Sequence, residues 1–68
     1  MKLINLAKKL DFSTEYEYFD YCIDSHINGN FSQCEKLFKA MTKKDRKRLI
    51  DFIPEELKEI KKFYFKLL

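Results

Sequence analysis

The sequence predicts an all-α fold, a compact bundle of four main helices preceded by a short N-terminal helix. Its 68 residues include one glycine and one proline, so the turn-forming residues that a β-rich domain requires are nearly absent. Apolar residues form 46% of the chain and charged residues 37%, a balance that excludes a disordered tail. Four segments repeat apolar residues at helical spacing, each after a helix-start signal. We therefore expect one domain over residues 1–68, with helices at about 15–28, 31–41, 43–53 and 54–68.

The N-terminal segment offers apolar residues from Leu3 to Leu10, enough for two helical turns or for an irregular strap across the bundle. We favour the short helix. The first main helix opens on a capping box, because Thr14 and Glu17 have the required spacing. Gly29 suits the left-handed conformation that ends a helix. The expected apolar stripe of this helix is Phe19, Cys22, Ile23, His26 and Ile27.

Two capping pairs fit the start of the second helix, Asn30 with Gln33 and Ser32 with Glu35. Its expected apolar stripe is Phe31, Cys34, Leu37, Phe38 and Met41.

The third helix opens at Thr42 with Asp45, and Pro54 interrupts it because proline lacks the N–H that the helix needs. Pro54 followed by two glutamates is also a favourable opening for the last helix. The residues expected to be buried in these two helices are Leu49, Ile50, Ile53, Leu57, Ile60, Tyr64 and Leu67.

No catalytic, metal or cofactor motif stands out, so we expect neither an enzyme nor a cofactor. The apolar run from Leu3 to Ala7 is too short for a secretory signal, and no run approaches the length of a membrane span. We therefore expect a cytoplasmic protein in which Cys22 and Cys34 are reduced, buried thiols. With His26 they would supply three metal ligands at most, which is a weak basis for a metal site.

Charge is segregated along the chain. Residues 11–35 contain six acidic residues and no Lys or Arg, whereas residues 36–48 contain seven basic residues and one Asp. A net charge of +3 therefore conceals two opposed patches.

The acidic patch predicts a surface that binds a protein. Glu17, Asp20 and Asp24 lie at i, i+3 and i+7, so they share one side of the first main helix. Tyrosines among them would add rigid contact area with a polar tip. The predicted partner-binding residues are Glu17, Tyr18, Asp20, Tyr21 and Asp24. A homodimer is a further option, in which Phe63 and Phe65 form the seam.

The alternative is a small DNA- or RNA-binding regulator. Basic residues at the start of a helix, after a short turn from another helix, are what a helix-turn-helix protein uses on DNA. The candidate residues are Lys36, Lys39, Lys43, Lys44, Arg46, Lys47 and Arg48. Against it, the turn around Thr42 contains no glycine.

The run from Tyr21 to Gln33, followed by Leu37-Phe38 and by residues 45–52, resembles small all-helical accessory proteins of bacteriophages and mobile elements. The resemblance covers about residues 16–53. It implies a protein that acts by binding, as an inhibitor or modulator of a host protein or defence complex in the bacterial cytoplasm.

Overall fold

The computed structural model describes all 68 residues and contains five α-helices, one short 3-10 helix and no strand. In chain order the elements are α1 (Leu3–Lys9), α2 (Glu15–Ile27), α3 (Phe31–Ala40), α4 (Lys43–Phe52), η1 (Glu55–Leu57) and α5 (Lys58–Leu67). The all-α prediction is confirmed, with a short N-terminal helix. The last helix differs from the prediction, because residues 55–57 form a 3-10 turn and the α-helix starts only at Lys58.

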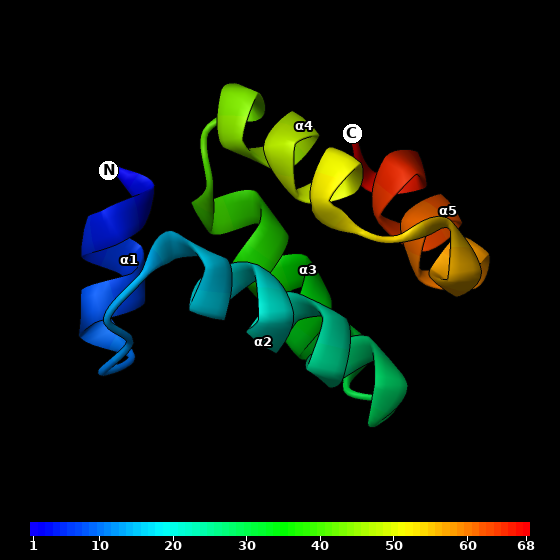
Figure 1. Cartoon of the computed structure of the whole chain (residues 1–68), viewed down its shortest axis with the longest axis horizontal. Helices are drawn as coiled ribbons and strands as arrows, with labels where there is room; N and C mark the ends of the chain where they lie inside the picture. The colour runs from blue at the N-terminus through cyan, green and yellow to red at the C-terminus, as the bar shows by residue number, and fades with distance from the viewer.

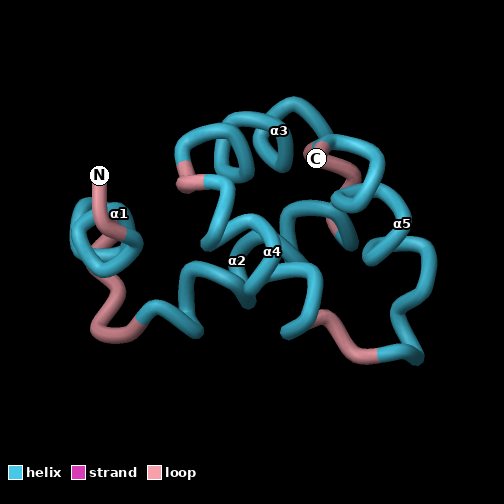
Figure 2. Tube along the Cα trace, turned by 90° about the horizontal axis from the view of Figure 1, so that it is seen from above, coloured by secondary structure: helices cyan, strands magenta, loops and turns pink.

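From α2 to α5 the helices reverse direction at each connection, whereas α1 runs at an angle across α2 (Figure 1). α2 and α3 pack as an antiparallel pair, α1 packs on α2, and α5 packs on both α3 and α4. α1 and α5 therefore lie at opposite ends of the molecule, as Figure 2 shows from above.

Two threonines start helices as the sequence predicts. The Thr14 Oγ1 atom accepts from the Glu17 N–H at 3.3 Å, and the Glu17 carboxylate accepts from the Ser13 N–H at 3.1 Å. At α4 the Thr42 Oγ1 atom accepts from the Asp45 N–H at 3.2 Å. These bonds satisfy N–H groups that the first helical turn leaves without a partner.

The predicted side-chain cap of α3 is wrong for both pairs. α3 begins at Phe31 after Asn30, and no side chain caps it. The amide of Gln33 instead points across to α2, where it donates to the Tyr21 hydroxyl. A tertiary contact therefore replaces the local one.

Left-handed residues end the first two helices. Gly29 has φ 76°, which lets the Asn30 N–H reach the Ser25 carbonyl at 2.8 Å and close the end of α2. Asp11 has φ 63° and ends α1 in the same way, because the Phe12 N–H reaches the Ala7 carbonyl at 3.0 Å. This backbone conformation is strained for a residue with a side chain but not for glycine.

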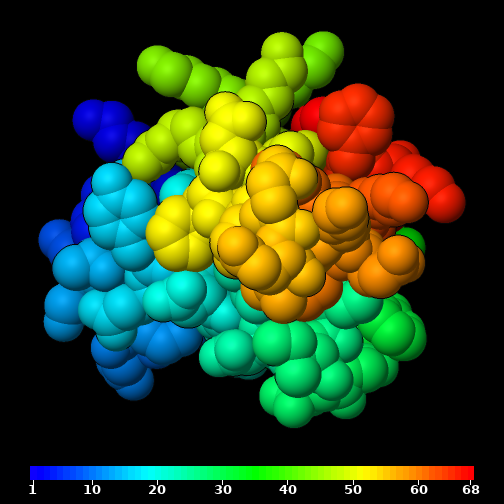
Figure 3. Space-filling view, turned by 45° about the vertical axis from the view of Figure 1, so that its right-hand side comes forward, coloured from blue at the N-terminus to red at the C-terminus, as the bar shows by residue number.

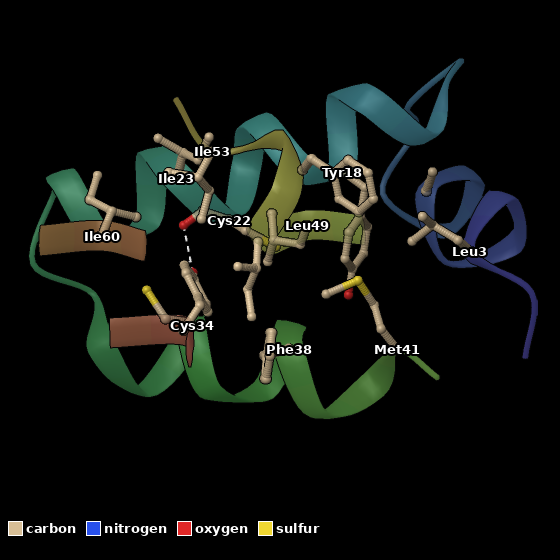
Figure 4. Close-up of a cluster of buried hydrophobic side chains, with 14 residues drawn as sticks. Leu3, Tyr18, Cys22, Ile23, Cys34, Phe38, Met41, Leu49, Ile53 and Ile60 are labelled. Atoms are coloured by element: carbon tan, nitrogen blue, oxygen red, sulfur yellow. Dashed lines mark hydrogen bonds between the residues drawn. The ribbon is translucent and has the colours of Figure 1, made fainter. Parts of the chain in front are cut away.

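All five α-helices contribute to one core of 14 buried apolar residues (Figure 4). Two buried tyrosine hydroxyls tie the helices together: Tyr64 of α5 donates to the Cys22 carbonyl of α2 at 2.6 Å, and Tyr18 of α2 donates to the Leu37 carbonyl of α3 at 2.7 Å. Every buried side-chain nitrogen and oxygen has a hydrogen-bond partner. The core therefore contains polar groups without leaving any of them unsatisfied.

Two residues expected in the core are exposed. Ile27 is 62% exposed and Phe31 is 50% exposed. They flank the turn that connects α2 and α3. Ser25 is buried instead, with its hydroxyl donating to the Tyr21 carbonyl one turn earlier at 2.8 Å.

Candidate functional site

The acidic side of α2 is only partly as predicted. Asp20 and Asp24 are exposed and enter no ion pair. Glu17 is also exposed, but its carboxylate belongs to the capping box described above. Tyr21 is half-buried, with its ring edge-on to Phe12 at a centroid distance of 5.6 Å. The two aspartates are therefore the acidic groups most available to a partner.

Tyr18 does not lie on this surface, so its placement among the partner-binding residues is wrong. It is 2% exposed, because it shares with Cys22 the side of α2 that faces the core. Its hydroxyl reaches the Leu37 carbonyl across the α2–α3 interface. Burial raises the pKa of this hydroxyl far above its usual value.

Tyr16 occupies the position that was expected for Tyr18. It is 59% exposed and stacks on Phe52 at a centroid distance of 5.8 Å. Its spacing of four residues from Asp20 was visible in the sequence. Tyr16, Asp20, Asp24 and Ile27 thus follow one another at helical spacing along the outer side of α2, and we call these four residues the α2 face.

Phe31, the first residue of α3, is a further exposed apolar side chain beyond the turn that ends α2. It is half-exposed and packs on Phe63 and His26, at centroid distances of 5.7 and 5.1 Å. The exposure of Ile27 and Phe31 could not be predicted from the sequence, because both continue the apolar stripes of their helices.

The predicted basic segment does not form one surface. Arg46 donates through Nε to the carbonyls of Phe38 and Met41 at 3.0 and 3.1 Å, and through Nη2 to the Lys39 carbonyl at 2.9 Å. These carbonyls lie at the C-terminal end of α3, where no N–H group of the next helical turn is present to donate to them. Arg46 is therefore a structural cap of α3. Lys36 lies elsewhere, beside Tyr21 in a shallow depression between α1 and α3.

Arg48 is also engaged within the molecule. Its two terminal nitrogens contact Glu15 at 3.0 Å and Asp45 at 2.9 Å. Hydrogen bonds to these carboxylates raise the pKa of the guanidinium still further. The basic side chains of the segment that remain exposed without an acidic partner are Lys36, Lys39, Lys43, Lys44 and Lys47.

A second basic site lies between α4 and α5. A groove of about 440 Å³ is lined by Ile50, Glu55, Lys58, Lys61, Lys62, Phe65 and Lys66. Charge counting along the sequence does not reveal it, because residues 49–68 contain four acidic and four basic residues. All four of those lysines line the groove, whereas only one of the acids does.

The cysteines are free and buried, as predicted. Burial, with a smaller contribution from Cys34, raises the pKa of Cys22 to about 12, so this thiol stays protonated at neutral pH. His26 packs edge-on against Phe31 and Phe63. No three His, Cys, Asp or Glu side chains come together as a metal site.

The fold and these surfaces define a small five-helix protein with an acidic, partly apolar helix face and a lysine-lined groove. No family model, curated protein or solved structure matches the chain. None of its helices combines the length and apolar character needed to cross a membrane.

Proposed function

We propose that this chain is a non-catalytic protein-binding module and that the α2 face, extended by Phe31, is its binding surface. The observation that carries the proposal is that large apolar side chains stay exposed at both ends of an acidic helix face, Tyr16 at the start of α2 and Ile27 at its end, with Phe31 exposed beyond the following turn. Buried aromatic and aliphatic anchors supply most of the affinity of protein interfaces.

The exposed groups on α2 do little for the fold itself. Asp20 and Asp24 lie one turn apart and repel each other by a few tenths of a kcal/mol. Ile27 leaves most of its surface in water, so the burial that stabilises core residues by about 1.5–3 kcal/mol each is largely unrealised. A partner that covers Ile27 would recover that free energy.

The charge of the face favours a basic partner. Acidic groups beside apolar anchors accelerate the encounter with a positive surface and exclude negative ones. Stacking on Phe52 holds the Tyr16 ring in place before binding, which lowers the entropy lost on association.

The resemblance to accessory proteins of bacteriophages and mobile elements supplies the biological setting of the proposal. In that setting the protein acts in the cytoplasm of a bacterial host, as an inhibitor or modulator of a host protein or defence complex. No reaction is assigned to it, because its two thiols are buried in the core.

Affinity capture from nuclease-treated bacterial lysate, followed by measured binding of the retained protein, tests the proposal. Asp24→Lys and Ile27→Ala should each weaken that binding at least about tenfold, since they alter the charge and an anchor of the interface. Glu56→Lys and Leu10→Ala are matched controls, because they reverse a charge and truncate an aliphatic side chain at exposed positions outside the α2 face. Equal affinity for all four variants and the wild type would exclude the α2 face as the binding surface.

A further inference from the structure

The outer side of α5 is a continuous stripe of lysines around one aromatic ring. Lys58, Lys61, Lys62, Phe65 and Lys66 follow at i, i+3, i+4, i+7 and i+8, the spacing of a single helix face. This stripe is one wall of the groove between α4 and α5.

α4 contributes further positive charge to the same region. Ile50 lines the groove, and Lys43 and Lys47 precede it by seven and three residues, on the same side of α4. Both lysines are exposed. In Figure 3 the long side chains from the start of α4, in green to yellow, project from the molecule beside the red C-terminal end of α5.

Little negative charge offsets these lysines. Glu55 is the one acidic residue that lines the groove, and it pairs with Lys61 at 2.9 Å. Lys58, Lys62 and Lys66 have no acidic partner within ion-pair distance. Glu59 lies with Lys62 and Lys66 around the adjacent depression near His26. The groove therefore carries a net positive charge.

Fold stability does not explain this arrangement. Lys58, Lys62 and Lys66 are spaced four residues apart, and like charges at that spacing destabilise a helix. Phe65 is 64% exposed among them, so its ring adds little to the core. An exposed aromatic ring within a basic groove instead matches the chemistry of a ligand that carries both negative charge and flat apolar faces.

We propose that the α4–α5 groove binds single-stranded nucleic acid, with its lysines on the phosphates and Phe65 stacked on a base. Lys58, Lys62 and Lys66 recur about every 6 Å along the helix axis, comparable with the distance between consecutive phosphates of an extended strand. A ring can stack only on a base that is free of its own neighbours, which favours a single strand over a duplex. The lysines are assigned to phosphates, and stacking on Phe65 is open to any base, so binding is tolerant of sequence.

An anionic membrane fits the groove less well. A helix that lies on a bilayer inserts its apolar side, but the apolar side of α5 faces the core through Ile60 and Tyr64. The hydroxyl of Tyr64 is bonded to α2, so lifting α5 onto a membrane would open the fold.

A second copy of the chain also fits less well. Its acidic α2 face could meet this groove, but the two surfaces differ, so the contact would be of the head-to-tail kind. Such a contact forms a closed ring or an open chain of copies.

The test is fluorescence anisotropy of the full chain with labelled single-stranded oligothymidine at several salt concentrations. About three to four phosphate contacts predict a slope of log K against log salt of roughly −2 to −3. Lys62→Glu with Lys66→Glu should weaken binding at least about tenfold and make the slope shallower by about 1.4, the contribution of two phosphate contacts. Phe65→Ala should weaken binding about fivefold to a hundredfold while leaving the slope unchanged, because stacking releases no counterions.

Lys8→Glu with Lys9→Glu is the matched control, since it makes the same change of charge on α1, at the end of the molecule opposite α5. It should stay within about threefold of the wild type, since that distance exceeds the Debye length at physiological salt. No binding to the strand, equal loss in the two double variants, or no effect of Phe65→Ala would overturn the proposal. So would tighter binding to duplex DNA, polyglutamate or anionic vesicles than to the strand, or a change to self-association in sedimentation that Lys62→Glu with Lys66→Glu abolishes.

Discussion

Alkaline pH should unfold this protein, because three acidic protons are held in its core. Tyr18, Cys22 and Tyr64 are all buried, and desolvation is the main cause of a raised pKa at each. In the unfolded chain these groups lose their protons at about pH 8.5 for cysteine and about pH 10 for tyrosine. The folded protein retains the protons beyond those values, so its stability falls as the pH rises through them.

The expected loss is comparable with the whole stability of the domain. Each retained proton costs about 1.4 kcal/mol for every pH unit above the pKa of the unfolded chain. By about pH 11 the three groups together remove about 6 kcal/mol. A chain of this length has a total stability between about 3 and 10 kcal/mol.

Urea unfolding followed by circular dichroism, under reducing conditions from about pH 7 to 11, measures this loss. The free energy of unfolding should stay level below about pH 8 as far as these three groups are concerned, and then fall with increasing slope. Tyr64→Phe should cost about 1 kcal/mol at neutral pH through its lost hydrogen bond, and it should reduce the slope above about pH 10 by about one third. A free energy that is level up to pH 11, or a slope that Tyr64→Phe does not change, would refute the reasoning.

Three further predictions concern helix ends and are checked by the same unfolding measurement. Arg46→Ala should destabilise the protein by about 2–3 kcal/mol, because three hydrogen bonds from a charged group to carbonyls are lost. The exposed control Lys47→Ala should change the free energy of unfolding by no more than about 0.5 kcal/mol. Similar values for the two variants would exclude Arg46 as a cap. Thr42→Ala should cost about 1 kcal/mol through the lost cap of α4, and no change would mean that water replaces the threonine. Gly29→Ala should destabilise the protein by about 1 kcal/mol, because it places a side chain at the left-handed end of α2. Asp11→Gly should stabilise it by a similar or smaller amount, because it removes a side chain from the left-handed end of α1. Effects of the same sign would contradict the role assigned to backbone strain.

The α4–α5 groove shows why a charge count along the chain missed a candidate site. The count for residues 49–68 is neutral, yet α5 places Lys58, Lys62 and Lys66 on one side of the groove. Helical spacing alone could have grouped these lysines. It could not have shown that Ile50 and α4 form the opposite wall, because that depends on how α5 folds back after Pro54.

Local chemistry in the sequence determined where the helices begin and end. Thr14 with Glu17, Thr42 with Asp45, and Gly29 act within a few residues of themselves, and α2 and α4 start and α2 ends where these signals predict. The choice of an all-α fold rests on the same short-range bonds and on apolar spacing.

Only the tertiary structure decided which side of each helix is covered. Tyr16 and Tyr18 are both compatible with the surface of α2, and the packing of α3 against that helix buries the second of them. Arg46 belongs to the basic segment that the sequence offers as a binding surface. In the structure the end of α3 lies close to it, and the guanidinium donates its hydrogen bonds to carbonyls there. The physical reason is that helix spacing defines faces, whereas burial and pairing depend on neighbours that are distant in the chain.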